Sequence, residues 1–139
     1  MAALPPVIVQ PVRQHTNYAC AIASLAMLIG WDYSAVFDYT HRKIGERIKT
    51  GLWIRDMKGV ARHFGVPLVS KRMFDVDEST GLLLIRQGRH RSDHAVLLFN
   101  GTIYDPMDGQ LWEPDAYLAS YAPKLKARFH TLLTVLSSP

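Results

Sequence analysis

Residues 14–29 read QHTNYACAIASLAMLI and contain Cys20, the single cysteine of the chain. From Cys20 to Ile29 almost every side chain is apolar or small, on all sides of a helix. A helix that is apolar all round is a buried one. The segment therefore predicts a helix at the centre of the core, and Gly30 is a plausible stop for it.

The start of this helix gives Cys20 a possible chemical role. Thr16 and Asn17 are both good capping residues, which places Cys20 in the first turn. The helix dipole and unpaired backbone N–H groups favour a thiolate there, and His94, if it lies nearby, can carry the proton as imidazolium. We therefore expect a pKa of the Cys20 thiol below the ordinary value of about 8.5, with the histidine as the larger cause. The alternative is that Cys20 is a small hydrophobic residue of the core, since free cysteine is often fully buried.

Composition narrows the class of protein. The chain has 139 residues, of which 48% are hydrophobic and 20% charged, and this predicts one globular domain over residues 1–139. A single cysteine cannot form an internal disulfide, so nothing indicates an oxidising compartment. The net charge of +4 comes from scattered groups, which predicts a solvated surface and no nucleic-acid partner. Without a signal peptide or membrane segment, we expect a cytoplasmic protein.

The hydrophobic period changes along the chain, from helical in the first half to alternating in the second. Helices are predicted at 34–39, 41–49 and 54–64, with a further short helix near 114–121. Strands are predicted at 7–10, 66–71, 82–86, 94–99, 102–105 and 128–136. Helices followed by antiparallel strands indicate an α+β fold, in which the helix starting at Cys20 packs against the sheet.

Residues 94–106, HAVLLFNGTIYDP, contain Asn100-Gly101 between two apolar runs, the strongest short-range signal for a hairpin. A two-residue type I′ loop fixes the pairs Phe99–Thr102, Leu98–Ile103, Leu97–Tyr104 and Val96–Asp105. Asp105 is then a diagonal neighbour of His94 on one face of the sheet. The backbones of such neighbours are about 7–8 Å apart, which allows a side-chain hydrogen bond. Pro106 should end the strand and leave Asp105 near the edge of the sheet.

This chain resembles the papain-like cysteine peptidases, and most closely the bacteriocin-processing peptidases that cleave double-glycine leaders, through Gln14, Cys20, His94 and Asp105-Pro106. The resemblance implies a papain-like fold with the nucleophile at the start of a central helix packed on an antiparallel sheet. It implies Cys20 as the nucleophile, His94 as its base and Asp105 as the residue that orients the histidine. It also implies Gln14 as an oxyanion-hole donor.

The resulting interpretation is a cysteine peptidase that acts on a peptide or protein substrate without a metal or other cofactor. Cys20 attacks the carbonyl carbon, Gln14 and the Cys20 backbone N–H hold the oxyanion, and His94 protonates the leaving amine. Two alternatives remain open. One is a Cys-His-Asp acyltransferase, and the other is an inactive peptidase-like domain that binds peptides or a partner protein.

Overall fold

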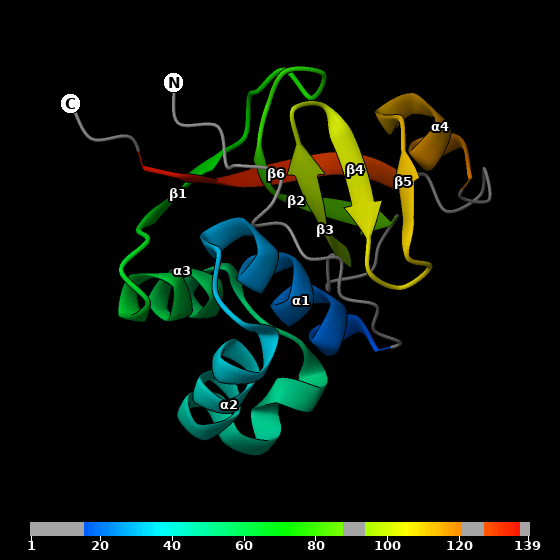
Figure 1. The fold of residues 1–139 in the computed structure, drawn as a ribbon. Coiled ribbons are helices and arrows are strands. Elements are labelled where there is room, and N and C mark those ends of the chain that lie inside the picture. The colour runs from blue at the N-terminus through cyan, green and yellow to red at the C-terminus, as the bar shows by residue number, and fades with distance from the viewer. Residues whose placement is uncertain (1–15, 88–93, 121–126, 137–139) are drawn as a thin grey trace.

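The computed structural model describes residues 16–87, 94–120 and 127–136. Within these ranges, helices are combined with a six-stranded antiparallel sheet of strand order β1-β6-β2-β3-β4-β5 (Figure 1). The predicted α+β class is therefore confirmed. The strand predicted at 7–10 lies outside the described residues.

Helix α1 (Asn17–Ile29) has the predicted ends. The Thr16 hydroxyl accepts a hydrogen bond from the Ala19 backbone N–H at 3.2 Å, and Gly30 closes the helix with φ 76°. Every residue from 20 to 29 is buried, with at most 7% of its surface exposed. The helix packs mainly on strand β3 of the sheet, as predicted, because it has no polar face to turn toward water.

The next helices differ from the prediction. The prediction of two short helices at 34–39 and 41–49 is wrong. The structure has one α-helix, α2 (Tyr33–Ile44), followed by a 3₁₀ helix, η2 (Gly45–Thr50). The buried Thr40 hydroxyl donates to the Val36 carbonyl at 2.7 Å, inside the helix, so Thr40 does not interrupt it. The break falls instead at Gly45, whose φ is 70°. Helix α3 (Ile54–His63) agrees with the predicted helix at 54–64.

The described strands match the prediction closely, with one addition. Strand β5 (Gln110–Trp112) is not predicted, because three residues are too few to show an alternating pattern. The short helix α4 (Pro114–Ala119) follows β5, near its predicted place. The other strands are β1 (Leu68–Lys71), β2 (Gly81–Gln87), β3 (His94–Phe99), β4 (Thr102–Asp105) and β6 (Ala127–Val135).

The β3–β4 hairpin has the predicted register. Its observed pairs are Leu97–Tyr104, Leu98–Ile103 and Phe99–Thr102. Asn100 and Gly101 both have positive φ, 48° and 80°, as a type I′ turn requires. Local turn chemistry therefore fixes which side chains of β3 and β4 share a face.

Both faces of the sheet are buried. Ala95 and Leu97 pack in the core that contains α1, whereas Val96 and Leu98 pack in a second core with Tyr117 of α4. His94 has the same parity as Val96, and Asp105 the same parity as Ile103, which also belongs to the second core. We infer that the His94 and Asp105 side chains project from the face of the sheet that α4 covers.

Gly101 provides a test of how tightly the hairpin turn is held. A Cβ at Gly101 would collide with the backbone carbonyl of Asp77, whereas a Cβ at Gly65 has open space; φ is 80° and 82° respectively. Both alanine variants lose about 1–2 kcal/mol from the left-handed backbone, and Gly101→Ala loses about 1–3 kcal/mol more from the collision. Urea unfolding measures the difference. Equal free energies of unfolding for Gly101→Ala and Gly65→Ala would contradict the close contact.

Candidate active site

Three predicted site residues lie at the ends of three elements. Cys20 is the fourth residue of α1, His94 is the first residue of β3, and Asp105 is the last residue of β4. The start of β3 and the end of β4 lie at the same end of the sheet, because the two strands form an antiparallel hairpin. Figure 1 shows the first turn of α1, in dark blue, toward that end of the sheet.

His94 and Asp105 form the predicted side-chain hydrogen bond. The His94 Nε2 and Asp105 Oδ2 atoms are 3.3 Å apart, and the two side chains are only 10% and 9% exposed. The sequence prediction of this contact is confirmed. Because Nε2 faces Asp105, Nδ1 is the ring nitrogen that can exchange a proton with another group.

The Asp105 carboxylate accepts hydrogen bonds on both oxygens. Tyr117 donates its hydroxyl to Oδ2 at 2.6 Å, and the Met107 backbone N–H donates to Oδ1 at 2.9 Å. Burial alone would raise the pKa of Asp105, but the hydrogen bonds from His94, Tyr117 and Met107 and the charge of His94 together lower it. The site therefore holds an ionised carboxylate beside the imidazole.

The surroundings of Asp105 agree with the prediction and add a residue. Pro106 follows the end of β4, and Asp105 lies near the edge of the sheet, where it pairs with Gln110 of the edge strand β5. Tyr117 is a contact that sequence reasoning missed. It lies twelve residues after Asp105 and has 3% of its surface exposed. The sequence predicts its short helix but carries no signal for the direction of its hydroxyl.

The structure contradicts two predictions about Cys20, which are the low pKa of its thiol and the role of its backbone N–H as an oxyanion donor. Its side chain has no exposed surface, and burial, together with the charge of Asp105, raises the pKa of the thiol to about 11. The expected low pKa is wrong because loss of hydration outweighs the helix dipole, worth only about 0.3–1 kcal/mol. The Cys20 N–H donates to the Thr16 carbonyl at 2.8 Å. The Cys20 N–H is therefore already engaged within the helix and is not the oxyanion donor that we expected.

Electrostatic effects connect Cys20 to its neighbours on other elements. The Asp105 charge acts on the pKa of Cys20, and burial, then Tyr18 and Cys20, raise the pKa of Tyr33. The thiol thus lies within electrostatic range of the hairpin carboxylate and of the phenol at the start of α2. One turn after Cys20, the hydroxyl of the fully buried Ser24 has no hydrogen-bond partner among the described residues.

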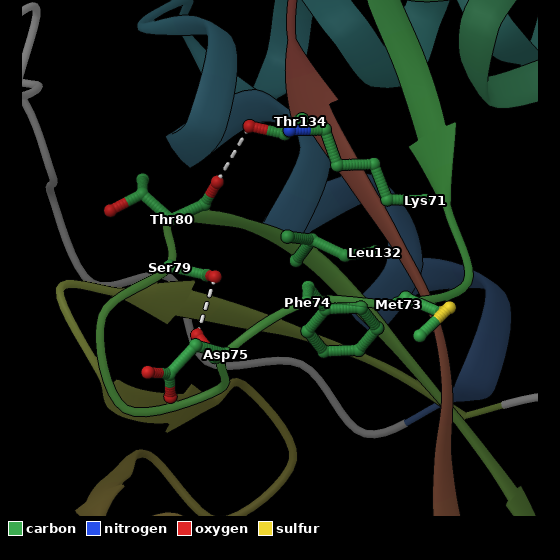
Figure 2. Close-up of a pocket in the computed structure, with 8 residues that line it drawn as sticks. All are labelled: Lys71, Met73, Phe74, Asp75, Ser79, Thr80, Leu132 and Thr134. Carbon is green, nitrogen blue, oxygen red and sulfur yellow. Dashed lines mark hydrogen bonds between the residues drawn. The ribbon is translucent and has the colours of Figure 1, made fainter.

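A separate pocket of about 300 Å³ lies between β1, β6 and the segment that precedes β2 (Figure 2). Its lining includes Lys71, Phe74 and Thr80, and the Thr134 hydroxyl donates to the Thr80 carbonyl at 2.9 Å. Thr80 immediately precedes Gly81, which pairs with Leu98 near the hairpin turn. The pocket therefore lies toward the opposite end of the sheet from His94 and is not part of the candidate active site.

The remaining predictions concern Gln14, metals and membranes. Gln14 lies outside the described residues. Across residues 16–87, 94–120 and 127–136, no His, Cys, Asp and Glu side chains group to hold a metal ion. No helix in those same ranges has the length and apolar character to cross a membrane.

Comparison with known proteins does not assign the chain to a family. No protein-family model matches this sequence, and no curated protein matches it significantly.

Proposed function

We propose that this chain is a papain-like cysteine peptidase that hydrolyses a peptide bond in a peptide or protein substrate. One observation carries the proposal. His94 and Asp105 form a largely buried pair with 3.3 Å between Nε2 and Oδ2, and the same carboxylate acts on the pKa of Cys20. A nucleophile, a base and a group that orients the base are the parts that acyl transfer through cysteine requires.

The raised pKa of Cys20 determines how the first step proceeds. With a pKa of about 11, roughly one thiol in 10⁴ is ionised at pH 7, so the resting nucleophile is neutral. His94 Nδ1 takes the thiol proton as the sulfur attacks the carbonyl carbon, which makes His94 a general base. Asp105 stabilises the imidazolium that forms, because its carboxylate faces Nε2.

The later steps use the same groups. The tetrahedral oxyanion is held by the Gln14 side chain, and the imidazolium of His94 gives its proton to the leaving amine as the C–N bond breaks. The product is a thioester on Cys20. His94 then takes a proton from water, the hydroxide attacks the thioester, and the thiol recovers its proton as the acid product leaves.

Burial of Cys20 favours a second candidate function. A sulfur with no exposed surface meets a peptide bond only after the groups that cover it move. A domain in which this movement does not occur binds a peptide or partner protein without cleaving it. The two candidates differ in one measurable property, which is whether the sulfur bonds to an electrophilic peptide.

A peptide aldehyde and a comparison of protein N-termini separate these functions. We expect the aldehyde to form a thiohemiacetal on the wild type but not on Cys20→Ala, detected by intact mass. Cells that express the wild type should contain new protein N-termini that cells expressing Cys20→Ala or His94→Ala lack. If the aldehyde binds without a covalent bond and N-termini are unchanged, the chain is a binding domain and the peptidase proposal fails.

A further inference from the structure

The Asp105 carboxylate is shared between the hairpin and α4. Its Oδ2 atom accepts from the Tyr117 hydroxyl at 2.6 Å and contacts His94 Nε2 at 3.3 Å, so the shorter contact is the one to the phenol. Tyr117 and Asp105 are both buried, at 3% and 7% exposure. Hydrogen bonds to an ionised acceptor are strong, and more so where water is excluded.

We propose that Tyr117 is a positioning residue of the active site, which holds the ionised Asp105 carboxylate in the orientation that faces His94. This inference rests on the proposed peptidase function. It assigns Tyr117 no contact with the substrate. Its effect on the reaction passes through Asp105 to the imidazole.

The position of Tyr117 is fixed by the segment that follows Asp105. The Trp112 ring meets the Tyr117 ring edge to face, with centroids 5.6 Å apart and an interplanar angle of 78°. Trp112 is held in turn, because its indole N–H donates to Asp108 Oδ2 at 3.0 Å. The same segment supplies the Met107 N–H to Asp105 Oδ1. One continuous stretch therefore supports both oxygens of the carboxylate.

Packing alone does not explain why residue 117 is a tyrosine and not a phenylalanine. Tyr117 lies in a core of apolar side chains, among them Val96, Leu98 and Ile103, where phenylalanine would fill the same volume. The hydroxyl is what reaches Asp105. Among the residues that the structure describes, its removal leaves Oδ2 with His94 as its partner, so a buried carboxylate loses one of the donors that keep it ionised.

Tyr117→Phe tests the inference directly. In protein labelled with ¹³C-aspartate, we expect the Asp105 carboxyl to titrate about one pH unit higher than in the wild type, because a donor that lowers its pKa is absent. Asp105→Asn assigns the signal. Tyr39→Phe is the matched control, because Tyr39 stacks on His63 with ring centroids 3.7 Å apart and is not a contact of Asp105. An unchanged midpoint in folded Tyr117→Phe would overturn the inference.

The rate of aldehyde capture between pH 3 and 8 separates this inference from the proposed function. Protonation of Asp105 at low pH removes the charge that orients and stabilises His94, so we expect the acid limb of the profile to move to higher pH in Tyr117→Phe and to stay in place in Tyr39→Phe. If the wild type forms an adduct and the acid limb is the same in Tyr117→Phe, the role of Tyr117 fails alone. If the wild type forms no adduct at all, the peptidase function fails and the positioning role fails with it.

Discussion

His94→Ala is expected to lower peptide hydrolysis by about 10²–10⁴-fold, which is the usual contribution of a general base. The physical reason is the resting state of the nucleophile. The pKa of Cys20 is about 11, so the sulfur attacks only if another group accepts its proton. Initial rates on a cleaved peptide measure the effect. Thermal unfolding shows whether the variant remains folded.

His63→Ala is the matched control for this prediction. His63 is an exposed histidine at the end of α3, and its ring stacks on Tyr39. We expect its removal to leave hydrolysis within about twofold of the wild type. A His94→Ala protein that is folded and retains most of its activity would exclude His94 as the base.

Asp105→Asn is expected to change hydrolysis and alkylation in opposite directions. The charge of Asp105 raises the pKa of Cys20, so neutralising it lowers that pKa and speeds reaction with iodoacetamide at pH 8. Burial is the larger cause of the shift, so the gain stays below about 100-fold. Hydrolysis falls by at least about tenfold, because the imidazolium loses the carboxylate that stabilises it.

The loss of hydrolysis in Asp105→Asn should remain smaller than in His94→Ala. An amide oxygen in place of Oδ2 still accepts from His94 and Tyr117, but the amide nitrogen then faces the Met107 N–H, which is also a donor. The imidazole of His94 is therefore still oriented in Asp105→Asn, although the hydrogen bond from the Met107 N–H is lost.

Intact mass after timed alkylation follows Cys20 alone, because the chain has one cysteine. Asp115→Asn is the matched control, since it removes an exposed carboxylate of α4. We expect its alkylation rate to equal that of the wild type. Slower alkylation in Asp105→Asn than in the wild type would contradict the proposed effect of the Asp105 charge on the thiol.

Local sequence signals predicted the parts of the structure that depend on neighbours in the chain. The Asn100-Gly101 turn fixed the register of β3 and β4, and that register brought His94 and Asp105 together. The apolar run after Cys20 likewise predicted a buried helix. Prediction failed where a local signal was ambiguous or too short. The predicted break between two helices at Thr40 does not occur, because the Thr40 hydroxyl bonds within α2. Strand β5 was not predicted, because it has only three residues.

The sequence by itself determined the α+β class, the α1 helix and the His94–Asp105 pair, because turn type, capping and side-chain alternation act over a few residues. Only the tertiary structure decided the burial and pKa of Cys20 and the contact between Tyr117 and Asp105. The pKa of the thiol depends on burial and on the charge of a carboxylate 85 residues away along the chain. The Tyr117 contact depends on how β5 and α4 fold back over β4. Desolvation and charge act through space, so no local pattern contains them.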